Sequence, residues 1–122
     1  MTPRLLVTCG DVNGIGIECF IEAMRTSTFD ATIELVVNPS TLAHYLTSIN
    51  STATVVGDQL HIGTTSVGII TIDVQTPVDL GRLSSSSGAH AIAALEYAAS
   101  AVANGDADGV VTLPINKEAC AL

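Results

Sequence analysis

The sequence has few positive charges. Among its 122 residues, four lysines and arginines stand against twelve aspartates and glutamates, which gives a formal net charge of -8. Nucleic acids and anionic membranes bind proteins through basic surfaces, and four cations spread along a chain cannot build one. The composition therefore predicts that neither nucleic acid nor membrane is a partner. The cations are Arg4, Arg25, Arg82 and Lys117.

Aromatic residues are also scarce, and no long apolar run is present. Aromatic residues make up 3% of the chain and hydrophobic residues 48%, so the core must consist mainly of Ala, Val, Ile and Leu. Such a core suits a parallel sheet whose strands are buried on both faces. No apolar run reaches the roughly 20 residues of a membrane-spanning helix, and no signal-peptide pattern precedes Asp11. The expected location is the cytoplasm.

The cysteines favour the same compartment. Cys9, Cys19 and Cys120 are odd in number and widely spaced, so they match neither a disulfide framework nor a CxxC metal pair. Reduced thiols are therefore expected. The chain length supports one hydrophobic core, and we expect residues 1–122 to form a single α/β unit.

Hydrophobic periodicity predicts alternating strands and helices. Strands are expected over 4–8, 32–37, 53–56, 59–62, 68–74 and 108–113, the third and fourth forming a hairpin. Helices are expected over 15–25, from an N-cap at Ser40 to Ile49, and from an N-cap at Ser87 to a stop at Asn104-Gly105. The predicted core faces are Ile15, Cys19, Phe20, Ala23 and Met24 in the first helix, and Ile92, Leu95, Ala99 and Val102 in the last.

This order of elements is typical of an open α/β sheet covered by helices, a three-layer α/β/α arrangement. In such sheets, ligands bind beyond the carboxyl ends of the strands. Two loops are expected there, because residues 10–16 follow the first strand and residues 112–117 follow the last. The sequence therefore predicts a site at these two loops.

The glycines of the first loop allow more than one interpretation. The dinucleotide fingerprint G-x-G-x-x-G fails, because Cys19 occupies its last position. The looser spacing of Gly10, Gly14 and Gly16 resembles the glycine turn of short-chain dehydrogenases. That family needs a Tyr-x-x-x-Lys pair, which this sequence lacks, and a carboxylate after the second strand, where Asn38 stands. The glycines could also serve only to turn the chain.

Three segments together resemble the amino-terminal portion of the 4-hydroxythreonine-4-phosphate dehydrogenase family. They are "VTCGDVNGIGIECF", "LGRLSSSSGAHAIAALEYAASAV" and "GDADGVVTLPINKEA", and they follow the family's order along the chain. The related isocitrate and isopropylmalate dehydrogenases carry a similar glycine loop, so the resemblance implies part of their fold. Val12 and Ile17 stand where the family usually has proline, which loosens the expected loop.

The resemblance implies an oxidoreductase of pyridoxal phosphate biosynthesis. Its reaction is the oxidation, with decarboxylation, of 4-phosphohydroxythreonine by NAD or NADP, with a divalent metal such as Zn or Mg. The family's Gly-His-Thr-Glu motif and three metal-binding histidines have no counterpart in this sequence. We therefore expect a fragment of a larger, homodimeric subunit, with its metal ligands elsewhere and without activity alone. His44, His61 and His90 have no metal-ligand spacing and are expected to be exposed or hydrogen-bonded.

The two loops supply the candidate site residues, and no catalytic residue is assigned. Lys117 and Thr112 are expected to bind the phosphorylated substrate, Lys117 through its charge. A second interpretation is a non-catalytic module that associates with itself, because a partial sheet exposes an edge strand and an apolar face. Residues expected to bind the cofactor or line the site are Asp11, Asn13, Gly14 and Gly16.

Overall fold

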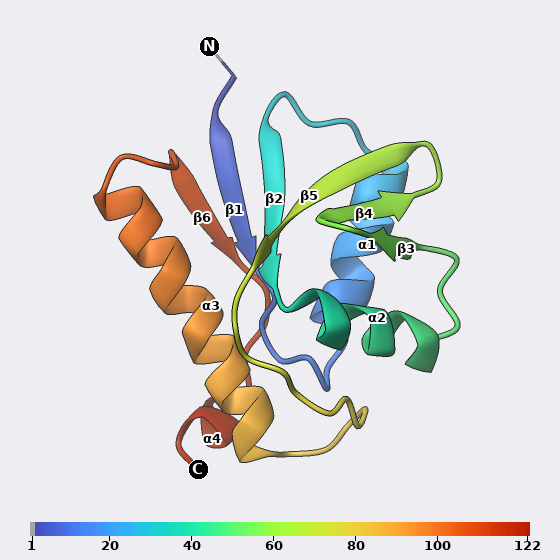
Figure 1. The fold of residues 1–122 in the computed structure, drawn as a ribbon, viewed down its shortest axis with the longest axis vertical. Helices are drawn as coiled ribbons and strands as arrows, with labels where there is room; N and C mark the ends of the chain where they lie inside the picture. The colour runs from blue at the N-terminus through green and yellow to red at the C-terminus, as the bar shows by residue number, and fades with distance from the viewer. Residues whose placement is uncertain (1) are drawn as a thin grey trace.

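A computed structural model describes residues 2–122 and shows the predicted alternation of strands and helices (Figure 1). The strands are β1 (Arg4–Thr8), β2 (Thr32–Val37), β3 (Thr54–Val56), β4 (Gln59–Ile62), β5 (Thr65–Thr71) and β6 (Gly109–Thr112). The helices are α1 (Gly16–Thr26), α2 (Pro39–Ser48), α3 (Ser85–Ala103) and the short α4 (Lys117–Cys120). Within the described residues, no helix combines the length and apolar character needed to cross a membrane.

The strands form one mixed sheet in the order β3-β4-β5-β2-β1-β6. β1 pairs in parallel with β2 and β6, and β2 pairs in parallel with β5. β3 and β4 form the predicted hairpin and join β5 in antiparallel orientation. The predicted open α/β sheet is confirmed, and the last three residues of β1 and of β2 are buried in it.

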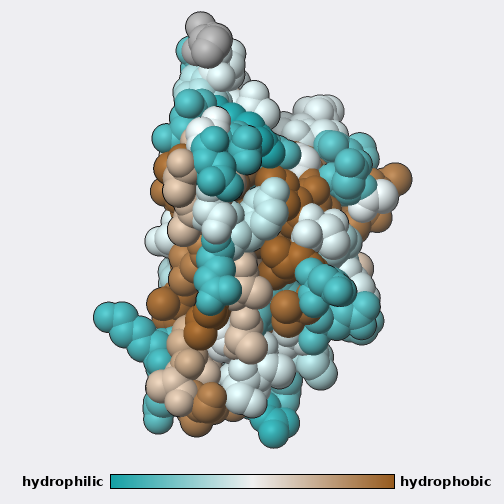
Figure 2. Space-filling view, turned by 60° about the vertical axis from the view of Figure 1, so that its left-hand side comes forward, coloured by the Kyte–Doolittle hydropathy of each residue, from teal (hydrophilic) through white to brown (hydrophobic). Residues whose placement is uncertain are grey.

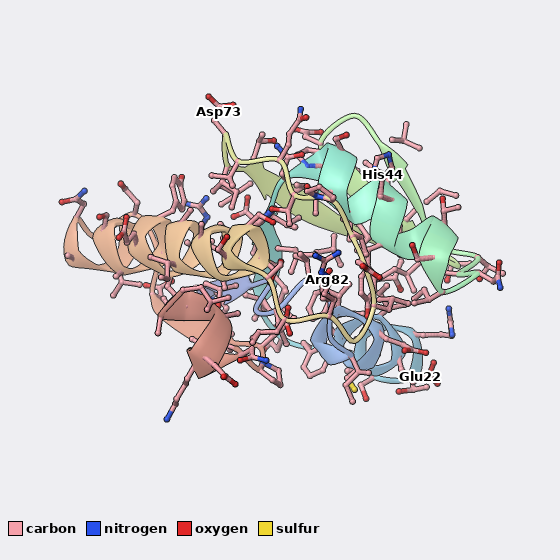
Figure 3. All side chains as sticks on the ribbon, turned by 90° about the horizontal axis from the view of Figure 1, so that it is seen from below. Glu22, His44, Asp73 and Arg82 are labelled. Atoms are coloured by element: carbon pink, nitrogen blue, oxygen red, sulfur yellow. The ribbon has the colours of Figure 1, made fainter. Side chains whose placement is uncertain are left out.

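The helices form a layer on each face of the sheet. Figures 1 and 3 show α1 and α2 on one side of the strands and α3 on the other. Right-handed crossovers explain this division. The steps from β1 through β2 to β5 run in one direction across the sheet, whereas the return from β5 to β6 runs the opposite way.

The predicted core face of α3 is wrong. Ile92 and Leu95 are half-buried and Val102 is 37% exposed, whereas a row of alanines faces the sheet. Small side chains bring the helix axis close to the strands, and the larger ones then lie along the helix flanks. The helix also begins earlier than predicted, because its N-cap is Ser84 and not Ser87. The alanines are Ala91, Ala94, Ala98 and Ala101.

The predicted starts and faces of the first two helices need similar corrections. Asn38, not Ser40, caps α2, and its side-chain oxygen accepts the Ser40 and Thr41 N–H groups at 3.0 and 3.2 Å. Apolar residues lie on two sides of α1, and the side that includes Ile17 and Ile21 is the buried one. Phe20 is buried as predicted and Met24 is half-buried, but three predicted core residues are exposed: Ile15, Cys19 and Ala23.

β5 lies earlier in the chain than predicted, and β6 is an open edge of the sheet. β5 starts three residues earlier than predicted, because a turn at Gly63, with φ of +59°, brings Thr65 opposite Ile62. β6 pairs on one side only, with β1, and Val110 and Val111 are 36% and 47% exposed. Figure 2 shows hydrophobic side chains gathered on this side of the molecule.

Candidate functional site

The two predicted site loops are joined at the carboxyl ends of β1 and β6. The Leu113 N–H donates to the Thr8 carbonyl at 3.2 Å, which extends the pairing of the two strands. The Asp11 N–H then donates to the Pro114 carbonyl at 2.9 Å. Loop 10–16 and loop 112–117 therefore lie side by side.

Two glycines of the first loop make this contact possible. Gly10 has a φ of +64°, and a Cβ there would lie 2.8 Å from the Leu113 carbonyl oxygen and closer still to that of Pro114. A Cβ on Gly16 would meet the Pro114 ring at 3.1 Å. These glycines thus make room for the chain's own second loop.

A hollow of about 520 Å³ lies where the two loops meet. Asp11, Gly14 and Gly16 line it from the first loop, and Lys117 lines it from the second. Four of the six predicted site residues are therefore brought together around this hollow, which also includes the Glu118 carboxylate. Another hollow, of about 550 Å³, lies between α1 and residues 49–52 and includes nothing from loop 112–117.

Asn13 and Thr112, the other two predicted residues, lie outside this hollow. Asn13 is 3% exposed, and its side-chain oxygen accepts the Asp79 N–H at 2.8 Å. Its amide nitrogen donates to the Arg82 carbonyl at 3.1 Å. Asn13 therefore holds loop 79–84 against the glycine loop. Thr112 is exposed on β6, opposite Thr8.

Tyr45 supports the glycine loop from α2. Its side chain is buried, and its hydroxyl donates to the Gly14 carbonyl at 2.8 Å. Burial raises the pKa of Tyr45. The helical pattern predicts Tyr45 only as a core residue, because periodicity carries no information on what a phenol hydroxyl contacts.

The three histidines are exposed or hydrogen-bonded, as predicted. His44 is exposed on α2 (Figure 3), and His61 Nδ1 lies 3.0 Å from Ser66 Oγ. His90 is fully buried, and burial lowers its pKa to about 4. Across residues 2–122, no three His, Cys, Asp or Glu side chains are grouped so that they could hold a metal ion. The described residues therefore do not fit the divalent metal that the resemblance implies.

The described residues also do not form a Rossmann dinucleotide cradle. Asn38 ends β2, where that fold needs a carboxylate for the ribose, and it is buried as the cap of α2. Glu34, inside β2, is paired with Arg4. The room beside Gly10 and Gly16 is filled by loop 112–117.

The cysteines have no place in this site. All three are free: Cys9 is buried, Cys120 is half-buried and Cys19 is exposed. Burial raises the pKa of Cys9 to about 12, so its thiol stays protonated and unreactive.

Comparison with known proteins connects this geometry to one family. Residues 20–122 match the family model described as "Pyridoxal phosphate biosynthetic protein PdxA". A Cutibacterium acnes protein named "Putative D-threonate 4-phosphate dehydrogenase" is 34% identical over 97% of this chain and 37% of its own. A 4-hydroxythreonine-4-phosphate dehydrogenase from Nostoc is 31% identical over 96% of this chain and 33% of its own.

Solved structures agree on the fold. A crystal structure of a 4-hydroxythreonine-4-phosphate dehydrogenase from Burkholderia phymatum superposes with a TM-score of 0.81 at 19% identity, covering 99% of this chain and 39% of that one. The Klebsiella pneumoniae enzyme of the same name gives 0.76 at 21% identity, with the same coverage. The chain thus spans between a third and two fifths of the length of these relatives.

Proposed function

The chain belongs to the PdxA family of pyridoxal phosphate biosynthetic proteins, and we propose from this that it carries part of the site of a nicotinamide-dependent dehydrogenase. The substrate is a phosphorylated hydroxy acid, 4-phosphohydroxythreonine in the first place. The observation that supports the proposal is the hollow where Asp11, Gly14, Gly16 and Lys117 meet at the carboxyl ends of β1 and β6. Family membership also replaces the short-chain dehydrogenase interpretation of the glycines.

Lys117 has the central role in this proposal. Lys117 is exposed and is the only cation among the described residues that line the hollow, which also includes the carboxylates of Asp11 and Glu118. A point charge there pairs with the phosphate or the carboxylate of the substrate. Asp11 and Gly14 line the hollow from the other loop, where they contact substrate or cofactor, and Thr112 contacts the substrate from the end of β6, outside the hollow. NAD or NADP supplies the hydride acceptor; a divalent metal, Zn or Mg, would be held by residues outside those described.

A second substrate has support from one relative. D-threonate 4-phosphate is named for the Cutibacterium acnes protein, at 34% identity. The two substrates share a terminal phosphate and a carboxylate, so Lys117 recognises either. They differ at the carbon beside the carboxylate, which carries an amine in one and a hydroxyl in the other. The homodimer and the cytoplasmic location complete the proposal.

Binding of both substrates to the chain tests the proposal directly. We expect Lys117→Gln to weaken binding of the phosphorylated substrates by roughly tenfold or more, the usual effect of losing a charge-assisted hydrogen bond. Arg25→Gln is the matched control, because Arg25 is an exposed cation at the far end of α1. Isothermal titration calorimetry gives the dissociation constants. Equal affinities for Lys117→Gln and the unchanged chain would refute the role of Lys117.

A non-catalytic, self-associating module is the second candidate function, and the exposed edge strand favours it. β6 has an unpaired edge and carries no charged residue to block pairing with another strand. Formation of NADH by the chain with NAD, metal and substrate would refute this candidate. Self-association without binding of substrate or NAD would instead support it.

A further inference from the structure

A third hollow includes Asn13 of the glycine loop but no other residue of the candidate site. Its volume is about 480 Å³, and it is lined by Asn13, Arg82 and the serines 84–86, together with Asp79, Pro77, Leu83 and Leu122. Figure 3 shows Arg82 near the middle of the view from below, between α3 and the layer of α1 and α2. Arg82 therefore lies over the same end of the sheet as Lys117, although the two cations belong to different loops.

Asn13 holds the backbone of the Arg82 loop in place. Its main-chain carbonyl accepts the Gly81 N–H at 2.7 Å, and its side-chain oxygen accepts the Asp79 N–H at 2.8 Å. Its amide nitrogen donates to the Arg82 carbonyl at 3.1 Å and lies 3.4 Å from Ser84 Oγ. Because Asn13 is itself buried, this loop is fixed relative to the glycine loop and to the hollow beyond it.

The guanidinium of Arg82 is only weakly engaged within the chain. Its ion pair with Asp79 is 3.4 Å long, and the two side chains are 69% and 61% exposed, a combination that contributes little to stability. Arg4, by comparison, lies at the opposite end of the sheet and binds Glu34 and the Asp106 carbonyl. Arg82 can therefore exchange its carboxylate for an anionic ligand at small cost.

The serine hydroxyls of the hollow suit a phosphoryl group, and Asp79, which also lines it, is the carboxylate that such a group would displace from Arg82. Ser85 is exposed and Ser86 half-buried, and hydroxyl groups can donate to phosphate oxygens. The planar guanidinium presents two parallel N–H groups that match two oxygens of a phosphate. Building on the proposed function, we infer that this hollow binds a phosphoryl group of the cofactor or the substrate, with Arg82 as the ion-pairing residue and Asn13 as its positioning residue.

Titration of the chain with inorganic pyrophosphate tests the inference without relying on turnover. We expect the amide NMR signals of residues 84–86 to shift with pyrophosphate, and Arg82→Gln to raise the dissociation constant read at these signals about tenfold or more. Arg25→Gln is the matched control, because Arg25 is also exposed and also paired with a carboxylate three residues earlier. Absence of a shift at residues 84–86, or equal constants for the two variants, would overturn the inference.

A double-variant cycle tests the positioning role of Asn13. In a chain that keeps Arg82, Asn13→Ala should weaken pyrophosphate binding. In a chain that already carries Arg82→Gln, Asn13→Ala should cause no further loss of affinity. Additive effects would mean that Asn13 acts on binding by another route and would overturn its role. Far-UV circular dichroism of each variant verifies folding, and Arg82→Gln, at an exposed position, keeps the test available if Asn13→Ala does not fold.

Two further titrations identify the source of the phosphoryl group. If NAD+ shifts the signals of residues 84–86 and phosphorylated substrate does not, the hollow holds the pyrophosphate of the cofactor. The reverse result assigns it to the phosphate of the substrate. Because Lys117→Gln is measured separately, failure at Arg82 leaves the Lys117 assignment intact, and failure at Lys117 leaves the Arg82 assignment intact.

Discussion

The buried His90 makes the stability of the protein depend on pH in a defined direction. His90 Nε2 accepts the Asn38 N–H at 3.3 Å, so the proton of the neutral ring is on Nδ1, which lies 2.8 Å from Thr76 Oγ1. Protonation of Nε2 would place its N–H opposite the Asn38 N–H, so the hydrogen bond between them would be lost. Burial accordingly lowers the pKa of His90 to about 4, from an ordinary value of about 6.5.

The sign and the size of the effect follow from this difference in pKa. Between about pH 4 and pH 6.5 the unfolded chain binds the His90 proton and the folded chain does not, so acid favours unfolding. The stabilisation is fully present above pH 6.5 and is lost as the pH falls through 4. At about 1.4 kcal/mol per pKa unit, His90 should remove roughly 2 to 3 kcal/mol of folding free energy between pH 7 and pH 4.5.

Comparison with His90→Gln isolates this contribution from that of the carboxylates. The Gln side chain does not titrate, and its oxygen can still accept the Asn38 N–H. We expect the unchanged chain to lose about 2 kcal/mol more than the variant between pH 7 and pH 4.5. Urea unfolding followed by far-UV circular dichroism measures this, since the chain has no Trp. Equal losses for the two proteins would refute the reasoning.

Two other predictions concern backbone fit and the sheet edge. Gly10→Ala should reduce the free energy of unfolding by about 2 kcal/mol or more, because the backbone is strained and the new Cβ meets loop 112–117. Gly57 has a similar φ of +61° but open space around it, so Gly57→Ala should reduce the free energy of unfolding by about 1 kcal/mol. Urea unfolding compares the two variants, and equal losses would contradict the close-approach argument. Val111→Lys should place a charge on the exposed edge of β6 and reduce self-association in sedimentation velocity, with the exposed Val56→Lys as control. An unchanged distribution of species would exclude β6 as the contact.

The sequence was sufficient for what depends on backbone patterns. The alternation of apolar runs and turns predicted the sheet, and the glycines and prolines at the strand ends predicted both loops. The faces of α1 and α3 were predicted wrongly for a physical reason. Apolar residues lie on several sides of each helix, and burial is decided by how closely the helix approaches the sheet, which favours the small Ala94 and Ala98.

Contacts between distant polar side chains lay beyond reach of the sequence. Asn13 was predicted to bind the cofactor or line the site, and no sequence pattern indicated that its amide also bonds to loop 79–84, some 66 to 71 residues later. The hydrogen bonds that join Asn38, Thr76 and His90 likewise link three separate elements. No local sequence pattern identifies such partners, because asparagine, threonine and histidine also occur commonly in exposed loops.

The place of β1 between β2 and β6 also determines the order in which this protein can fold. The contact between Arg4 and Asp108 closes a loop of 104 residues, so the first strand must wait for nearly the whole chain before its second neighbour arrives. The entropy of closing so long a loop is spent before the contact stabilises anything, which makes this pairing late and slow. During synthesis, β1 can pair with β2 early, while its other edge stays open to wrong partners. Because the candidate site spans the β1–β6 junction, the site is assembled only after β6 has joined β1.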